Sequence, residues 1–260
     1  MRVISVAVIC ATICILNAFG QTPFSGTFSS KGGTAEFPLP AFAPALVTGE
    51  PYAADQTTEL VQMLAGGTHV THTSAVTKLY RDSLGRTRIE RPMAGGVMLA
   101  AQIPNSPMLV EITDPPANSR YILDTVHKVA HRQPLPARQP TGEGLSPIAP
   151  PTGGNPQTVA QNLGAGTIEG IAVTGTRRTV TWPAGSRGND RPLTVVNETW
   201  FSPDLKIVVL NKSDRPDSGE QTQKLTNLSR SEPDPSLFQP PADYSIVDEA
   251  GAFTITWSAQ

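Results

Sequence analysis

The fold is decided by the stretch from Leu79 to Glu90, which reads LYRDSLGRTRIE. At its centre, Asp82-Ser83-Leu84-Gly85 places aspartate at the first position of a turn and glycine at the fourth, as a type I turn closed by a glycine bulge requires. Beyond the turn, Thr87 and Ile89 alternate with charged residues, which gives this segment one semi-apolar and one charged side. The stretch therefore predicts two antiparallel strands joined by a tight turn.

The same texture recurs along most of the chain. Runs rich in Thr, Val and Ile are separated by short turns, which indicates an antiparallel meander, and 25 Pro and 22 Gly exclude a helical bundle. We predict a mainly β protein built from one strongly curved antiparallel sheet, a partial barrel, with few short helices. One helix start is legible, where Asp234 is a good N-cap and Pro235 follows at the first helical position. The expected strands lie at 57–64, 68–80, 86–90, 108–112, 121–124, 126–132, 166–171, 173–182, 193–201, 205–212 and 220–229.

Composition divides the chain into four parts. We expect a signal peptide over 1–20, a loose Pro/Gly-rich arm over 21–51, a single antiparallel β domain over 52–250 and a C-terminal tail over 251–260. Within the domain, residues 133–157 hold seven prolines. Because proline cannot donate a hydrogen bond to a sheet ladder, we expect this stretch to leave the sheet as an excursion.

The N-terminus has the organisation of an export signal. Arg2 precedes an apolar run from Val3 to Leu16, and Ala18-Phe19-Gly20 places small residues at two key positions of a cleavage site. The run is shorter than the about 20 apolar residues that span a bilayer. We therefore expect cleavage after about Gly20, export to the periplasm or the extracellular space, and no transmembrane span in the processed chain.

Charge and cysteine content exclude several classes of function. The chain carries 20 basic and 22 acidic residues, so it lacks the positive excess of a nucleic-acid-binding protein. Its two cysteines, Cys10 and Cys14, both lie in the expected leader. The processed chain therefore has no cysteine for a disulfide, a nucleophile or a metal site.

The four histidines do not suggest a metal site. His69 and His72 are three residues apart on an expected strand, so they point to opposite faces. His127 and His131 would share a strand face but lie roughly 13 Å apart, too far for a common ion. We predict no metal and no cofactor.

A hydrolase is the alternative class, but the sequence shows no complete motif for one. The nearest approach to a nucleophile elbow, Gly185-Ser186-Arg187-Gly188, has the wrong spacing. Glu198 with Asp204, or Glu90 with Glu111, could serve a glycosidase if the fold brought the two acids together. A cross-strand ion pair is the favoured interpretation of Glu198. We assign no catalytic residue.

Two short basic stripes could suggest a phosphate site. Arg86, Arg88 and Arg91 form one, and Arg177 with Arg178 forms the other. In a chain of nearly balanced charge, we expect these arginines to pair with carboxylates on the faces of the sheet instead.

Several short blocks resemble recurrent elements of secreted bacterial proteins. They are the strand-turn-strand unit at 79–90, Ile112-Thr113-Asp114-Pro115 with Tyr121-Ile122-Leu123-Asp124, the hairpin at 200–205, and Glu232-Pro233-Asp234-Pro235-Ser236-Leu237-Phe238 with Pro241-Ala242-Asp243-Tyr244. Through these blocks the chain is similar to the lipoprotein-carrier class, which includes LolA-like, LolB-like and RseB-like domains. The resemblance covers roughly residues 52–132 and 166–247.

That resemblance implies a curved antiparallel sheet around a short helical plug, with an apolar concavity for acyl chains or a peptide. The chain departs from the class in lacking a lipobox, in having few helix-forming stretches for the plug and in carrying the insertion at 133–157, and no binding residue carries over. We expect an exported, non-enzymatic envelope protein that binds a lipid-like or peptide ligand, or a protein partner, on an apolar concave face. The alternatives are a secreted hydrolase acting on glycans or esters, and a structural or assembly component of the envelope with no small ligand.

Overall fold

The computed structural model describes residues 24–29, 31–41, 43–100, 103, 105–137 and 156–258. The expected signal peptide and most of the expected excursion lie outside the described residues. The elements are β1 (Ser25–Ser29), β2 (Gly32–Phe37), β3 (Tyr52–Met63), β4 (His69–Thr73), β5 (Thr77–Arg81), β6 (Thr87–Pro92), β7 (Met108–Asp114), β8 (Ser119–Asp124), β9 (Val129–Pro134), β10 (Gln157–Ile168), β11 (Ile171–Trp182), β12 (Leu193–Ser202), β13 (Ile207–Arg215), β14 (Gly219–Ser229), the 3-10 helix η1 (Pro235–Phe238), β15 (Ser245–Asp248) and β16 (Phe253–Ser258).

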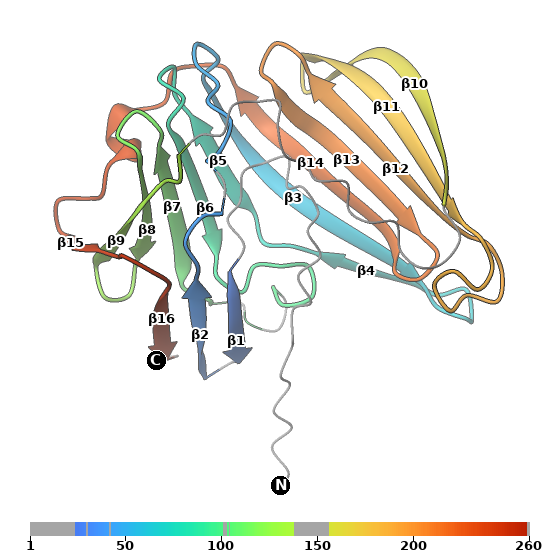
Figure 1. Cartoon of the computed structure of the whole chain (residues 1–260), viewed down its shortest axis with the longest axis horizontal. Coiled ribbons are helices and arrows are strands. Elements are labelled where there is room, and N and C mark those ends of the chain that lie inside the picture. The colour runs from blue at the N-terminus through green and yellow to red at the C-terminus, as the bar shows by residue number, and fades with distance from the viewer. Residues whose placement is uncertain are drawn as a thin grey trace, which may run out of the picture.

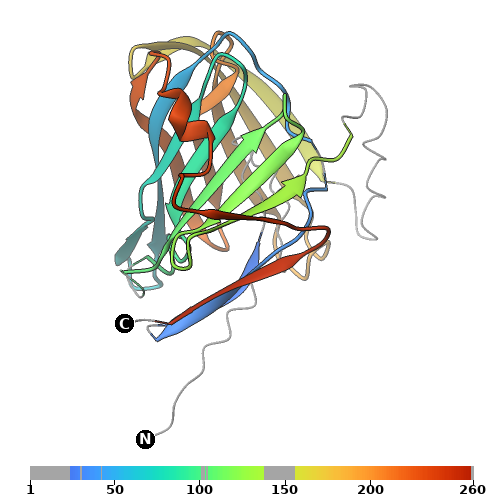
Figure 2. The same ribbon diagram turned by 90° about the vertical axis from the view of Figure 1, so that its left-hand side faces the viewer.

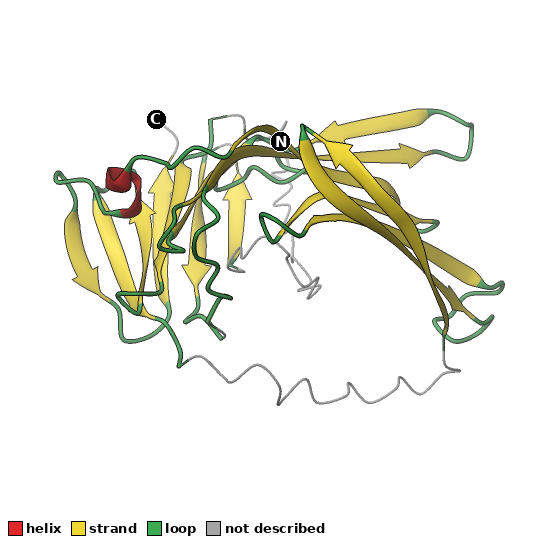
Figure 3. Ribbon diagram, turned by 90° about the horizontal axis from the view of Figure 1, so that it is seen from above, coloured by secondary structure: helices red, strands yellow, loops and turns green. Residues whose placement is uncertain are grey.

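One large sheet dominates the molecule (Figure 1). Its strand order is β10-β11-β12-β13-β14-β3-β5-β6-β7-β8-β9-β15, and β4 also pairs with β3. Seen from above, the sheet curves strongly and does not close into a barrel (Figure 3). The predicted fold class is therefore confirmed, with one parallel pair, β15 with β9, added to an otherwise antiparallel sheet.

The strand-turn-strand unit forms as the sequence predicts. Leu79 of β5 pairs with Ile89 of β6, and the Gly85 N–H donates to the Asp82 carbonyl at 3.0 Å. Gly85 has a φ of 81°, a left-handed conformation that favours glycine. The bulged turn thus sets the register of both strands.

A second, three-stranded sheet joins the two ends of the described chain. Its order is β1-β2-β16, and β2 pairs with β16 across more than two hundred residues of sequence. Figure 2 shows it lying against the strands of one half of the large sheet. The segments 21–51 and 251–260 thus contain strands where the sequence suggests a loose arm and a tail. Local pattern misses them because their partners are distant in sequence.

The half of the large sheet formed by β5 to β9, named the covered half, is packed on both faces. On the inner face, Leu109 and Ile122 are buried against Phe37 and Trp257 of the small sheet. On the outer face, Phe238 of η1 packs against residues of β7 and β8 that include Ile112 and Leu123. Each face thus contributes a separate apolar core.

The short helix begins as predicted. The Asp234 side chain accepts a hydrogen bond from the Ser236 N–H at 2.8 Å, and Pro235 follows the cap. That hydrogen bond lowers the pKa of the Asp234 carboxyl. η1 has four residues, and the part of the chain that the structure describes holds no helix long and apolar enough to cross a membrane.

Arg81 ties the covered half to the rest of the sheet. Its guanidinium donates to the Glu50 carbonyl at 2.7 Å and to the Leu205 carbonyl, in the turn between β12 and β13, at 2.5 Å. It also stacks on the Tyr52 ring, 4.8 Å from the ring centre. Arg81 is 5% exposed, so these contacts hold a buried charge among carbonyl oxygens.

Candidate functional site

The remaining half of the sheet, β10 to β14 with β3, is named the open half and carries a band of neutral hydrogen-bonding side chains. Register places Thr58 of β3 beside Gln223 of β14, and Gln223 beside Asn211 of β13. Asn211 lies beside Thr199 of β12, which lies beside Thr176 of β11. Because paired residues share a face, these five form one band across five strands, which we name the inner row.

Register also fixes the side of the sheet on which the inner row lies. Thr58 shares its face with Ala54, which pairs with Leu79 of the covered half. Leu79 pairs with Ile89, and the same face continues to Leu109, which packs under the small sheet. The inner row therefore lies inside the curve visible in Figure 3.

The residues adjacent to the inner row on the same strands are mostly charged. A second band across the same strands, the outer row, lies on the opposite face, and four of its five residues are charged. Its members are Glu59, Thr222, Lys212, Glu198 and Arg177. The inner row is thus uncharged, whereas the outer row is mostly charged and includes the Arg177–Glu198 ion pair.

The inner row has hydrogen-bonding groups that remain available to a ligand. Thr199 donates to the Asn211 amide oxygen at 3.0 Å, which leaves the Asn211 amide N–H groups available. Beside the row, Gln56 is 4% exposed, and its Oε1 is buried with no partner among the described residues. A buried acceptor left unpaired costs about 1–3 kcal/mol, so this amide lowers the stability of the sheet beneath the row.

Apolar side chains of the inner face gather elsewhere than the sequence suggests. They lie under the small sheet or at the end of the sheet near Arg81, where Tyr52, Leu79 and Leu225 are buried together. A shallow pocket between the segment around Leu46 and the β7–β8 turn measures about 200 Å³, below the roughly 300–1,000 Å³ of ligand cavities. The inner row is therefore polar, and the expected apolar lining does not extend over this band, although the same face also carries the buried Val195.

The acid pairs that the sequence left open are not assembled. Glu90 pairs with Val110 while Glu111 pairs with Ile89, so the two glutamates lie on opposite faces. Glu198 lies within β12, and Asp204 is exposed in the turn that follows, 4.0 Å from Arg230. Neither pair has the geometry of a glycosidase.

Glu198 instead forms the predicted cross-strand ion pair. Its carboxylate accepts from the Trp200 indole N–H at 2.8 Å and from Arg177 at 2.9 Å. Both hydrogen bonds hold the pKa of Glu198 below its ordinary value. A general acid needs a raised pKa, so this environment suits a permanent anion.

The other basic residues mostly pair as expected. Arg86 lies 2.6 Å from Asp82, and Arg88 lies 2.6 Å from Glu90. Arg91 lies over the Phe24 ring, and nearby Glu111 opposes the lowering of its pKa by burial. These three arginines therefore contact side chains of the protein itself, and their contacts do not indicate a phosphate site.

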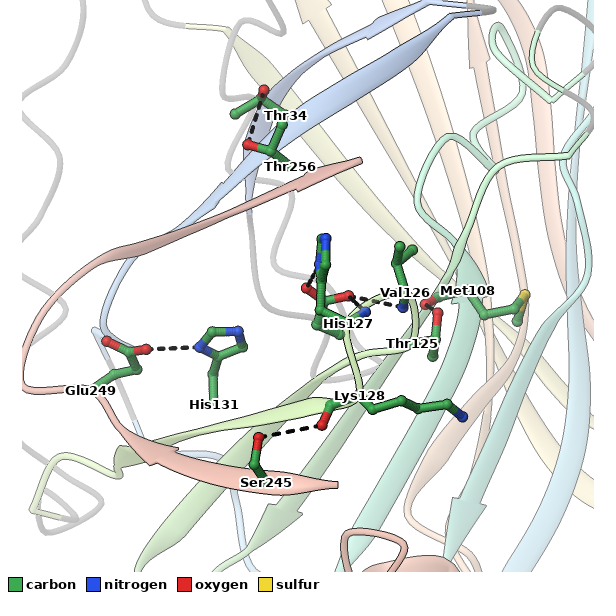
Figure 4. A network of polar contacts seen from close by, with 11 residues as sticks. Thr34, Met108, Thr125, Val126, His127, Lys128, His131, Ser245, Glu249 and Thr256 are labelled. Atoms are coloured by element: carbon green, nitrogen blue, oxygen red, sulfur yellow. Dashed lines mark hydrogen bonds and ion pairs between the residues drawn. The ribbon is translucent and has the colours of Figure 1, made fainter. Parts of the chain in front are cut away.

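Two of the histidines, His127 and His131, make polar contacts within the fold (Figure 4). His131 of β9 contacts Glu249 at 2.7 Å and stacks on Phe253, ring centres 4.2 Å apart. His127 lies in the turn before β9, where it contacts Asp124 at 2.7 Å. Our expected strand at 126–132 is therefore displaced to Val129–Pro134.

His69 and His72 both lie on β4, three residues apart, and the described part of the chain contains no cluster of three metal-ligating side chains.

The serine candidate also has a structural role. The Ser186 hydroxyl donates to the Pro183 carbonyl at 2.7 Å within the loop between β11 and β12.

Sequence reasoning missed the inner row, although its signal was present. Along β13, for example, neutral Asn211 and Ser213 alternate with charged Lys212 and Asp214. A strand with a neutral polar face and a charged face was legible before the register was known.

Comparison with known proteins gives similar solved structures but no family for the chain. No protein-family model matches the chain, and no curated protein matches it. Among solved structures the chain is similar to an uncharacterized conserved protein from Thermus thermophilus, with 9% identity, a TM-score of 0.37, and 77% of this chain and 91% of that chain covered.

Two further solved structures also match the chain. The MucA/MucB complex from Pseudomonas aeruginosa matches with 13% identity, a TM-score of 0.34, and 76% and 59% of the two chains covered. A LolA superfamily protein from Nitrosomonas europaea matches with 8% identity, a TM-score of 0.29, and 73% and 90% covered. The chain is thus similar to LolA-type and MucB-type proteins, and scores this low carry nothing about ligands or partners.

Proposed function

We propose that this chain is an exported, non-enzymatic envelope protein that binds an extended polypeptide segment of another envelope protein on its inner row. The observation that carries the proposal is the uncharged band of Thr, Gln and Asn side chains inside the curve of the open half. The leader-like N-terminus supports the location.

The chemistry of the inner row fits a peptide backbone. A peptide presents one N–H donor and one carbonyl acceptor per residue, and each needs a partner when it leaves water. Amide side chains such as Gln223 and Asn211 supply both donors and acceptors, as do the hydroxyls of Thr58 and Thr199. An uncharged surface accepts such a segment without burying an unpaired charge.

The same surface suits the other candidate ligands less well. An acyl chain offers no hydrogen bonds, so covering the inner row with it would leave amide and hydroxyl groups unpaired, at about 1–3 kcal/mol for each one buried. A sugar usually stacks on an aromatic ring, and the inner row contains only Thr, Gln and Asn. The polypeptide ligand is therefore favoured.

Direct binding measurements test the proposal. A random peptide library displayed on phage is selected on the purified protein, and the best peptide is synthesised and titrated by calorimetry. A fluorescent fatty acid and vesicles of anionic phospholipid serve as lipid probes. We expect the peptide to bind and both lipid probes to bind weakly or not at all.

Gln56→Leu sharpens the test. Replacing the unpartnered amide with an apolar side chain of similar size should leave the free energy of unfolding unchanged or slightly raised. Peptide affinity should stay within about twofold, because the buried Gln56 amide does not face a ligand on the inner row. Tight binding of the fatty acid together with failure of every selected peptide would contradict the proposal.

A further inference from the structure

The two ends of the large sheet differ in how they are protected. β15, at one end, has four residues, and its Asp248 is held by Arg132 at 2.5 Å. Short, charged edge strands discourage pairing with another chain. β10, at the other end, has twelve residues, QTVAQNLGAGTI, with no charge and no proline. It therefore lacks the usual sequence features that protect a sheet edge.

β10 is also exposed along its length. Among the described strands it pairs only with β11, and it lies at the outer edge of the sheet in Figure 1. Val159 on this strand is 54% exposed. One row of backbone N–H and carbonyl groups of β10 therefore faces away from the sheet with no partner strand in the described chain.

An aromatic ring lies within reach of this edge. A Cβ at Gly175 would come within 2.8 Å of the Trp200 ring, and a Cβ at Gly166 of β10 within 3.1 Å. The indole therefore extends over the glycines of β11 and β10. Because Gly166 has no side chain, a neighbouring strand could place an apolar side chain against the rim of the ring.

We propose that β10 pairs antiparallel with β10 of a second copy of this chain, which joins the two large sheets across a two-fold axis. In the register that sets Val159 opposite Gly166 of the other copy, Ala160 lies opposite Ala165 and Gln161 opposite Gly164. The bulge between Asn162 and Gly164 keeps each of these pairs on one face of the joined sheet.

The edge is complementary to itself in this register. The exposed Val159 of each copy fills the space left by Gly166 beside Trp200 of the other, and the axis repeats the contact. Because β10 carries no charge, no like charges meet across the new pair. These features favour a second copy over an unrelated strand as the occupant.

Sedimentation velocity over a concentration series tests the proposal with a matched pair of variants. We expect the unmodified protein to show a monomer–dimer equilibrium. Val159→Lys should weaken the dimer by at least about tenfold, because the lesion occurs twice across the axis. Val76→Lys, at a valine 47% exposed outside β10, should leave the dimer unchanged.

Crosslinking tests the register. With Cys10 and Cys14 replaced by serine, Ala160→Cys with Ala165→Cys should yield a covalent dimer under mild oxidation. A protein that stays monomeric throughout the series, or a dimer that survives Val159→Lys, would overturn the proposal. So would a protein that is monomeric alone yet adds a strand from a different protein at β10. None of these outcomes bears on peptide binding at the inner row.

Discussion

The two halves of the large sheet differ in how their faces are covered. In the covered half, both faces carry apolar residues, and each face is packed by another element, the small sheet inside and η1 outside. In the open half, the inner row carries neutral polar residues, and the outer row carries mostly charged residues that include the Glu198–Arg177 ion pair. A curved sheet can therefore leave a face uncovered if that face hydrogen-bonds well to water or to a ligand.

The two halves are therefore expected to contribute differently to the stability of the fold and to ligand binding. The covered half has a buried core on each face. In the inner row, Gln223, Asn211 and Thr199 are half-buried and Thr176 is exposed, so they can exchange water for a ligand. Equal substitutions in the two halves should therefore have unequal effects on the free energy of unfolding.

The largest difference is expected for phenylalanine. Phe238→Ala removes a ring that is 1% exposed between η1 and the sheet, and should lower the free energy of unfolding by about 3–5 kcal/mol. Phe201→Ala, on β12 of the open half, removes a ring that is 39% exposed and should cost about 1 kcal/mol or less. Urea unfolding of both variants measures the difference. Equal losses would mean that the Phe201 ring is packed as tightly as the Phe238 ring.

Glutamate provides the second comparison. Glu111 lies 3.6 Å from Arg120, whose side chain is 1% exposed, and Glu111→Gln should cost about 3 kcal/mol because a buried guanidinium would lose its counter-charge. Glu198→Gln breaks a pair in which Arg177 is 43% exposed, so we expect a loss below about 1 kcal/mol. Denaturant midpoints at neutral pH compare the two. A larger loss for Glu198→Gln would reverse the assignment of the two halves.

Glycine tests local packing in the open half. Gly175→Ala would bring a Cβ within 2.8 Å of the Trp200 ring, and displacement of the ring should cost about 1–3 kcal/mol. Gly66→Ala is the control, since a Cβ there meets nothing within 4 Å. Thermal unfolding reports both. If Gly175→Ala proves as mild as the control, Trp200 does not lie tightly on β11.

The smallest effect is the pH dependence of Glu198. Its folded pKa is lowered, so its ion pair contributes stability above the ordinary glutamate pKa of about 4.3 and loses that contribution as pH falls through the lower folded value. The small stability difference between the unmodified protein and Glu198→Gln should therefore be present at neutral pH and vanish in acid. A difference that grows on acidification would contradict the ion pair.

Much of the fold could be predicted from local sequence. The turn at Asp82–Gly85 and the cap at Asp234 depend on residues within four positions of one another, and both formed as expected. The strands β1, β2 and β16 could not be predicted, because Ala35 pairs with Ile255 and the pattern exists only across that distance. His127 was misplaced because a turn of positive-φ Lys128 interrupts the apparent strand.

The candidate site was harder to predict than the fold. Alternation along β13 shows that Asn211 and Lys212 lie on opposite faces, but it does not reveal which face is inside the curve. That assignment needs the register of every strand from β3 to β7, together with the small sheet that marks the inner side. Non-local pairing, more than local propensity, therefore determines whether the hollow is apolar or polar.

Adjacent residues of β13 provide the most direct test of the inner row as the binding surface. Asn211→Ala changes the inner row and Lys212→Ala the outer row of one strand, and each variant is titrated with a peptide selected on the unmodified protein. We predict an affinity loss of about fivefold or more for Asn211→Ala and little change for Lys212→Ala. Loss of binding in Lys212→Ala with Asn211→Ala unaffected would place the ligand on the convex face and contradict the account.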